Sequence, residues 1–237
     1  MNSTDAGNRA PKSVLSFLGL SALLIGAGWA LANKTAEAGH PGGAAGKGKP
    51  SVASELPVPG SYQIDPVHSF VYFSAWHHIV GLVRGRFDHT TGSITAAQDP
   101  ALCALDVTID TFSVSTQFTE RDDDLRGPDF FDVRKFPTMK YQGHGIRQTS
   151  GGQWSMNGTL TIRGISKVVP IIFTFKGLFP DAPANEPPRA SFHAIAATKR
   201  GDFGMIRDNK TELGVPPGPG NDVDIEIDVE ANKIQPK

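Results

Sequence analysis

The sequence predicts an all-β protein with an antiparallel sheet, on three observations. In residues 222–230, Val and Ile alternate strictly with Asp and Glu, and residues 105–109 repeat this alternation. Such a period of two is typical of a strand with one face buried and the other in water. No segment of the domain has the long helical repeat that connects parallel strands.

Short apolar runs bounded by Gly, Pro, Asn and Asp continue through residues 61–237. About eight strands in a domain of this size suit a barrel or a sandwich, and the pattern leaves both open. The Pro-rich segments 180–188 and 208–220 are predicted to be loops that together form the mobile rim at one end of the barrel. The predicted strands are 62–65, 69–75, 82–89, 92–95, 105–109, 139–145, 153–162, 166–175, 189–198 and 222–230.

Residues 1–32 are predicted to be a signal peptide or a membrane anchor. Arg9 and Lys12 precede an uncharged apolar run, 14–32, which ends in an A-x-A arrangement of small residues. This pattern is typical of secretory signals, but the run is also just long enough to cross a bilayer. We therefore expect an exported protein, with association to the inner membrane through this segment as the alternative. Residues 33–60, rich in Gly, Ala and Pro, are predicted to be a flexible linker.

Composition excludes several classes of protein. The 237 residues carry 24 acidic and 23 basic side chains, so there is no basic excess to indicate nucleic-acid binding. Cys103 is the only cysteine, which excludes an intramolecular disulfide and a cysteine-based zinc site. His68, His77 and His78 lack the spacing of a metal motif. We predict no metal site and expect His68 or His77 to be a buried polar group or a hydrogen-bonding partner of a ligand.

A charge-dense stretch, 119–137, interrupts the strands and predicts a helical cap across one end of a barrel. Thr119 is predicted to be the N-cap, and Gly127 with Pro128 to end the helix. A second short helix is expected to carry Phe130 and Phe131 inward.

The same stretch is rich in ionic groups. Asp122, Asp123 and Asp124 are expected to be exposed and paired with Arg121 and Arg126. Arginines that lie where strands or the cap meet turns suit a phosphate or carboxylate head group if they share one barrel mouth, and otherwise form surface ion pairs. They are Arg121, Arg126, Arg163 and Arg200.

Aromatic residues fall in or beside most predicted strands. An eight-stranded barrel either fills its interior with such side chains or keeps a slot for one apolar ligand, and the sequence leaves both open. The residues are Phe70, Tyr72, Trp76, Phe87, Phe112, Tyr141, Trp154, Phe173, Phe175 and Phe192.

Taken in order, several motifs resemble those of the YceI-like family, over residues 61 to about 233. They are YQIDPVHSFVYF (62–73), Trp76-His77, GRF (85–87), RDDDLRGPDFFDVRKFP (121–137), GTLTIRGISKVV (158–169), RGDFGM (200–205) and DVDIEIDVEA (222–231). The positions that match the family's motif are His68, His77, Arg121, Asp122, Leu125, Arg126, Asp129, Phe130, Lys135, Pro137, Gly158, Gly164, Arg200, Asp202 and Phe203.

This resemblance implies a bacterial, periplasmic, eight-stranded antiparallel lipocalin-like barrel with a short helical cap. It further implies an apolar tunnel that holds a polyisoprenoid, such as a polyprenyl phosphate or a quinone. The family commonly has His at the position of Asp124. The negative charge of Asp124 at the cap disfavours a phosphate head group and favours an uncharged, quinone-like head group.

We therefore predict a non-catalytic protein that sequesters or transports a long-chain isoprenoid in the periplasm, with no cofactor beyond the bound isoprenoid lipid or isoprenoid quinone. The alternatives are an enzyme that uses His68 or His77 with a cap carboxylate, and a filled barrel that serves only for docking. A homodimer is a further open expectation. The predicted ligand-binding residues are His68, Phe70, Tyr72, Trp76, His77, Arg121, Leu125, Arg126, Phe130, Phe131, Phe173, Phe175, Arg200 and Phe203.

Overall fold

The computed structural model describes residues 56–235, except 79, 150, 180–185 and 208–217. The predicted signal or anchor segment, 1–32, and most of the predicted linker, 33–60, lie outside the described residues, as do large parts of the two Pro-rich loops. Within the described part of the chain, no helix is both long and apolar enough to cross a membrane.

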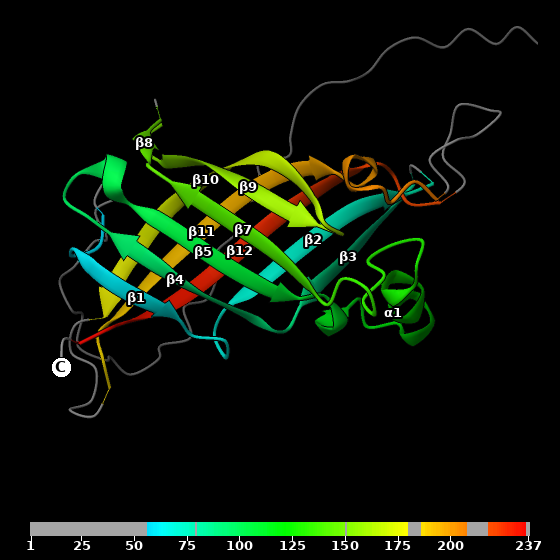
Figure 1. Ribbon diagram of the computed structural model, residues 1–237, viewed down its shortest axis with the longest axis horizontal. Coiled ribbons are helices and arrows are strands. Elements are labelled where there is room, and N and C mark those ends of the chain that lie inside the picture. The colour runs from blue at the N-terminus through cyan, green and yellow to red at the C-terminus, as the bar shows by residue number, and fades with distance from the viewer. Residues whose placement is uncertain (1–55, 79, 150, 180–185, 208–217, 236–237) are drawn as a thin grey trace, which may run out of the picture. The chain divides into compact units, whose positions relative to one another are not determined.

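Strands dominate the domain, and all strand pairs are antiparallel (Figure 1). The one α-helix among the described residues is α1 (Thr119–Arg126). The strands are β1 (Gly60–Ile64), β2 (Phe70–His77), β3 (Gly81–Phe87), β4 (Thr90–Ala96), β5 (Ala104–Asp110), β6 (Val114–Ser115), β7 (Thr138–His144), β8 (Arg147–Gln148), β9 (Trp154–Ile162), β10 (Ile165–Phe179), β11 (Arg189–Lys199) and β12 (Asp222–Lys233).

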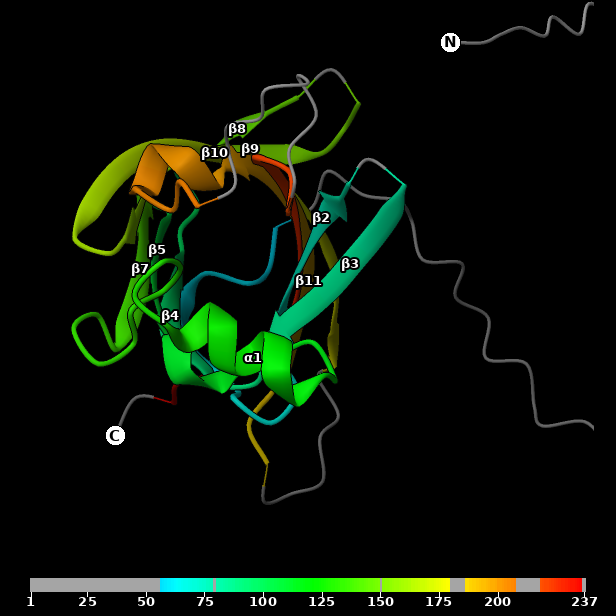
Figure 2. The same cartoon turned by 90° about the vertical axis from the view of Figure 1, so that its right-hand side faces the viewer.

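Strand β1 pairs with both β4 and β12, and this closes the sheet into a ring. The ring runs β1-β4-β5-β7-β9-β10-β11-β12, so the predicted eight-stranded antiparallel barrel is confirmed. Strand β2 continues from β1 along the same edge of β12, and β3 and β6 extend the wall beyond it. Figure 2 looks along the barrel from the end that carries α1.

Aspartate side chains stabilise the turns that separate β1 from β2 and β5 from β6. Between β1 and β2, Asp65 accepts hydrogen bonds from the backbone N–H of Val67 and from the ring of His68, both at 2.9 Å. Between β5 and β6, Asp110 accepts from the backbone N–H of Phe112 at 2.8 Å. Aspartate favours such turns because its short side chain bonds to the backbone two residues ahead.

Each predicted strand overlaps an observed strand, with the largest difference in β10. This strand extends beyond the predicted end, 175, to Phe179, because an irregularity at Gly177 lets it continue past the alternating pattern. Strands β6 and β8 were not predicted, since two residues carry no periodic signal. The prediction that both Pro-rich loops form the rim at one barrel end was wrong: their described residues, 186–188 and 218–220, lie at opposite ends of β11, because one loop enters this strand and the other leaves it.

Tyr141 packs over a glycine in the wall of the barrel. A Cβ atom at Gly158 would lie 2.2 Å from the ring carbon Cζ of Tyr141, so only glycine allows this close approach. The Tyr141 hydroxyl donates to the carbonyl of Val169 at 3.0 Å. Burial raises the pKa of Tyr141 to about 12, against a small opposing effect of the Gly158 backbone.

We expect the Tyr141 phenol to destabilise the fold at alkaline pH. Below pH 10 the phenol is protonated in both states, whereas between about pH 10 and 12 it ionises only in the unfolded chain. Stability should therefore fall over this range, by on the order of 2 kcal/mol from this group. Urea unfolding from pH 9 to 11.5 should show a shallower fall for Tyr141→Phe than for the unchanged protein. Parallel curves would contradict the assignment.

Candidate functional site

The barrel encloses a cavity of about 790 Å³. Its wall is mainly apolar, so the fully packed interior that would favour a docking-only barrel is not observed. The strand residues that line it include Ile64, Val71, Phe73, Val83, Phe87, Ile94, Leu105, Val107, Ile109, Met139, Tyr141, Met156, Leu160, Ile162, Val169, Ile171, Phe173, Phe192, Ala194, Ala196, Val223, Ile225, Ile227 and Val229.

Phenylalanines from separate loops close one end of this cavity. Phe130, in the segment after α1, and Phe203, in a 3₁₀ turn after β11, are both buried. The ring of Phe131 meets that of Phe87 edge-on, with 5.4 Å between centroids. The predicted inward direction of Phe130 and Phe131 thus agrees with the structure, although they lie in turns and the expected second helix is not observed.

Helix α1 crosses part of the same barrel end (Figure 2). The N-cap position is occupied by Phe118, with no side-chain cap, so the prediction of Thr119 as N-cap was wrong. Asp122 was expected to be exposed but is buried, because it accepts hydrogen bonds from both the N–H (2.7 Å) and the hydroxyl of Thr116. Arg121 donates to the Thr116 hydroxyl (2.7 Å) and carbonyl (3.0 Å). These bonds tie α1 to the residue that follows β6.

Two further arginines at this end of the barrel donate hydrogen bonds to backbone carbonyls. Arg126 donates to the carbonyls of Phe112 and Val114, at 3.0 and 2.8 Å, and pairs with Asp123 at 3.1 Å. Arg163 donates to the carbonyl of Phe130, which joins the β9–β10 turn to the cap.

Arg200 has a similar structural role. This buried guanidinium donates to three carbonyls, those of Gly220 (2.9 Å), Met205 (2.7 Å) and Pro219 (2.7 Å). The bonds span both ends of the loop between β11 and β12. Arg200 therefore shapes the cavity end on which it lies.

Asp124 has a cationic partner that sequence reasoning missed. Arg207, from the loop after β11, forms an ion pair with Asp124 and lies 3.5 Å from a carboxylate oxygen of Asp129. Asp124 and Arg207 both line the cavity. No sequence signal links positions 83 apart, so only the closed barrel brings them together.

The structure brings most, but not all, of the predicted ligand-binding residues to the cavity. Five of them do not line it: His68, Phe70, Trp76, Arg126 and Phe175. Those that line it are Tyr72, His77, Arg121, Leu125, Phe130, Phe131, Phe173, Arg200 and Phe203. Sequence reasoning missed the aliphatic wall, because alternating Val, Ile and Leu are equally typical of a filled core.

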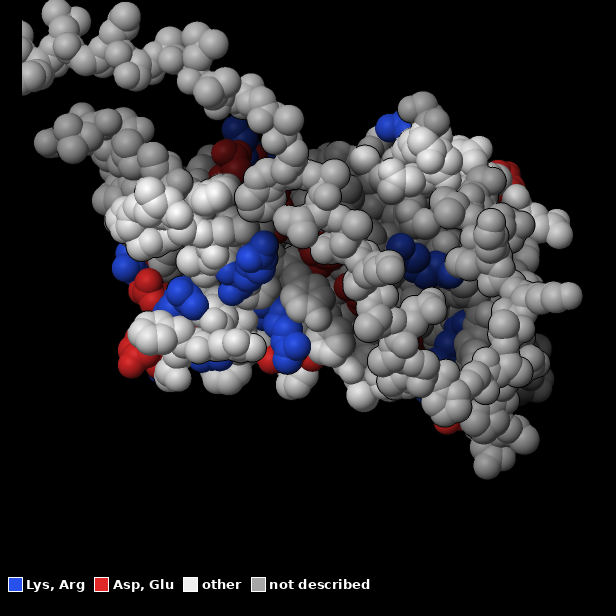
Figure 3. Space-filling model, turned by 180° about the vertical axis from the view of Figure 1, so that it is seen from behind, with Lys and Arg blue, Asp and Glu red and all other residues white. Residues whose placement is uncertain are grey.

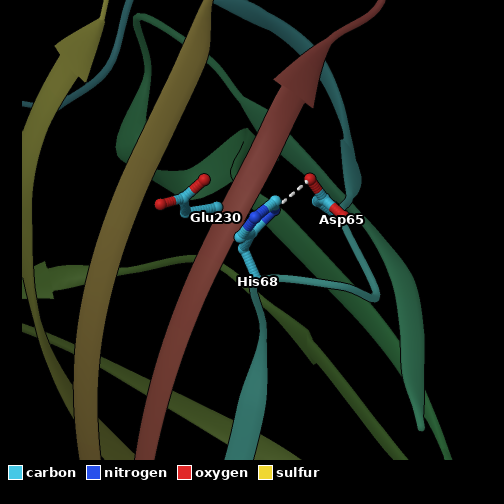
Figure 4. Close-up of side chains that lie close together, drawn as sticks. All are labelled: Asp65, His68 and Glu230. Atoms are coloured by element: carbon cyan, nitrogen blue, oxygen red, sulfur yellow. Dashed lines mark hydrogen bonds and ion pairs between the residues drawn. The ribbon is translucent and has the colours of Figure 1, made fainter.

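His68 belongs to an ionic cluster at the β1–β2 break, shown with Asp65 and Glu230 in Figure 4. Arg189 Nη1 lies 3.6 Å from Asp65 and 3.2 Å from Glu230, so a guanidinium already neutralises the carboxylates. Burial raises the pKa of Asp65, but hydrogen bonds from His68 and the Val67 N–H, with the Arg189 charge, outweigh it and lower the pKa overall. His68 is thus paired away from the cap carboxylates that the enzyme alternative requires.

His77 lines the cavity at the tip of β2 and meets the ring of His78 at 3.9 Å. No carboxylate of the described residues hydrogen bonds to it, so the structure offers no formed acid–base pair there. Another His and carboxylate cluster, His193 with Glu226 and Asp228, lies on β11 and β12 outside the cavity lining. The absence of a metal site stays a prediction.

Comparisons with known proteins agree with this geometry. The YceI-like domain model matches residues 62–231. Protein YceI of Escherichia coli O6:H1 is 32% identical over 176 residues, which cover 73% of this chain and 87% of that protein. The structure of the YCEI protein of Campylobacter jejuni has 27% identity and a TM-score of 0.55, covering 66% of this chain and 88% of that one. A polyisoprenoid-binding domain from Saccharophagus degradans has the same fold at 16% identity, with a TM-score of 0.55 over 73% of this chain and 98% of that one.

Proposed function

This chain belongs to the YceI-like family, and we propose that its barrel binds a long-chain isoprenoid lipid with an uncharged, quinone-like head group. The protein sequesters or carries this lipid in the periplasm and does not transform it. The observation that carries the proposal is the apolar cavity of about 790 Å³ inside a barrel closed by a cap.

The apolar wall suits a hydrocarbon chain. Burial of each methylene contributes about 0.8 kcal/mol, so ten buried carbons supply roughly 8 kcal/mol without any charged contact. The cavity volume lies within the range of small-molecule sites, about 300–1,000 Å³. A few polar groups then suffice to orient the head group.

The cap end supports an uncharged head group. The arginines that line the cavity, Arg121, Arg200 and Arg207, already donate to backbone carbonyls, to Thr116 or to carboxylates. A phosphate at this end would have to compete with Asp124 and Asp129 for Arg207. Glu120, which also lines the cavity, adds a further negative charge.

Two further observations favour this function. The related fold from Saccharophagus degradans is a polyisoprenoid-binding domain. The uncharged apolar run at 14–32, preceded by Arg9 and Lys12, supports export of the chain to the periplasm.

The test is to identify what the protein carries. The full chain, expressed in a bacterium with an intact export system, is analysed by native mass spectrometry and then by organic extraction. We expect one isoprenoid per protein, without phosphate. A protein that arrives empty and takes up no quinone from detergent micelles would refute the proposal. A bound polyprenyl phosphate would refute the uncharged head group alone.

Substitution of Asp124 should change the preference for head groups. In Asp124→Asn, Arg207 loses the nearer of the two carboxylates that pair with it among the described residues, so less negative charge opposes an anionic ligand there. We expect affinity for a polyprenyl phosphate, relative to the matched polyprenol, to rise roughly fivefold, which corresponds to an exposed ion pair of about 1 kcal/mol.

The matched control is Asp123→Asn, which removes a neighbouring carboxylate that pairs with Arg126 and does not line the cavity. Its preference should stay unchanged. An equal change in both variants would mean that the effect comes from overall charge and not from Arg207.

A further inference from the structure

Exposed apolar side chains gather at the end of the barrel that carries the cap. Trp76 is 51% exposed, Val80 82% and Ile206 68%. Phe112 and Phe118, before α1, are exposed as well. Large apolar groups that share one exposed surface in this way are typical of interaction sites.

These residues come from three separate segments at the cap end of the barrel: the β2–β3 hairpin, the segment before α1 and the loop after β11. Trp76 and Val80 lie at the tip of the β2–β3 hairpin, which projects at the same barrel end as α1 in Figure 2. The hairpin tip is fixed to the β11–β12 loop, because the Gly220 N–H donates to the Trp76 carbonyl at 2.6 Å. Ile206 precedes Arg207, which pairs with α1, and Phe118 lines the cavity.

Arginines accompany the exposed aromatic rings. The guanidinium of Arg121 lies 5.6 Å from the ring centroid of Phe118, and that of Arg126 lies 4.8 Å from that of Phe112. Figure 3 shows Lys and Arg side chains at this end of the molecule, interspersed with Asp, Glu and uncharged residues. Aromatic rings combined with Arg are characteristic of residues at membrane–water interfaces, where the ring enters the acyl boundary and the cation stays at the head groups.

We propose that this end of the barrel docks on a lipid bilayer, with Trp76, Val80 and Ile206 inserted at the interface. The purpose of such docking rests on the proposed function, since a carrier of a water-insoluble chain must exchange it at the bilayer. Phe118, one of these exposed apolar residues, lines the cavity, so docking brings the bilayer against an end of the cavity at which the lipid would be exchanged. The apolar run at 14–32, joined to the barrel by the linker 33–60, keeps a bilayer within reach if it remains an anchor.

The opposite end offers a matched comparison. Leu102 is 67% exposed there, as large a fraction as Ile206. Leu56 and Pro57 line the cavity from that side, and among the described residues no cation lies over a ring near Leu102. Phe179 is 56% exposed at that end too, so exposed apolar area does not distinguish the two ends. The cap end differs in that arginines lie over its exposed aromatic rings.

Trp76 is itself the probe for the test. In full-length protein carrying Trp29→Phe, so that the N-terminal segment contributes no signal, vesicles of phosphatidylethanolamine and phosphatidylglycerol with brominated acyl chains are added. We expect Trp76 emission to shift to the blue and to be quenched. Trp29→Phe with Trp76→Phe gives the signal of buried Trp154 alone.

Val80→Ser with Ile206→Ser should then require at least about tenfold more lipid for the same quenching, because two inserted side chains are lost. Leu102→Ser should leave the curve unchanged. Neither Val80 nor Ile206 lines the cavity, so uptake of isoprenoid from detergent micelles should persist in the double variant.

Each outcome decides one question. Unquenched Trp76 in a protein that still loads from micelles would overturn the docking proposal and leave the proposed function intact. Quenched Trp76 in a protein that takes up no isoprenoid would support the docking proposal and overturn the proposed function. Equal losses for Leu102→Ser and the double variant would show that the cap end is not the docking face. Unquenched Trp76 that cross-links instead to a protein partner would likewise overturn bilayer docking.

Discussion

Ala196→Trp should abolish isoprenoid binding while the barrel stays folded. Ala196 is on β11, and its small side chain lines the cavity beside Ile225 of β12, with which it is in register. An indole at this position extends into the space that the ligand would occupy. If it displaces about five carbons of the chain, the loss is about 4 kcal/mol, or roughly a thousandfold in affinity. Titration with a fluorescent isoprenoid analogue measures this loss directly.

Ala197→Trp is the matched control, because the next residue on a strand points to the opposite face. Ala197 is exposed and does not line the cavity, so the same enlargement should leave affinity unchanged. Thermal unfolding of both variants shows whether a loss of binding comes from a blocked cavity or from an unfolded protein. If Ala196→Trp binds as tightly as the unchanged protein, the ligand does not occupy the middle of the barrel.

The fold was largely predictable because its signals are local. The alternation of apolar and polar residues in 222–230 and 105–109 is expected of strands with one buried and one solvent-exposed face. The turns are marked in the sequence by Asp, Gly or Pro. Closure of the ring was not predictable from these signals. It depends on β12, which is long enough to pair with β2 through Asp224–Asp228 and then with β1 through Ala231–Lys233.

The candidate site was predictable only in part, because it is assembled from distant segments. Phe130 and Phe203 stood out as aromatic residues within motifs, and both close the cavity. Trp76 stood out equally, yet its side chain is exposed at a hairpin tip, since strand patterns do not show where a strand leaves the barrel wall. The pairing of Asp124 with Arg207 carries no sequence signal, although it places a carboxylate against a cation that lines the cavity.

Arg200→Met should destabilise the fold by about 3 kcal/mol, because it leaves the carbonyls of Met205, Pro219 and Gly220 without their donor. An unsatisfied buried carbonyl costs about 1–3 kcal/mol, and solvent from the cavity compensates part of the total. Urea unfolding measures the loss. Lys199→Met, which removes an exposed cation 3.8 Å from Asp222, should cost at most about 0.5 kcal/mol.

The same variant separates two roles for Arg200. If its guanidinium serves the loop, as its bonds to carbonyls indicate, Arg200→Met lowers stability and weakens the binding of polyprenol and polyprenyl phosphate alike, because the cavity end loses its shape. If Arg200 instead recognises an anionic head group, stability stays near that of the unchanged protein and only the phosphate loses affinity. Arg200→Lys sharpens the comparison, since an ammonium keeps the charge but cannot span three carbonyls in the planar geometry of a guanidinium. We expect Arg200→Lys to be destabilised nearly as much as Arg200→Met, with no selective change for the phosphate.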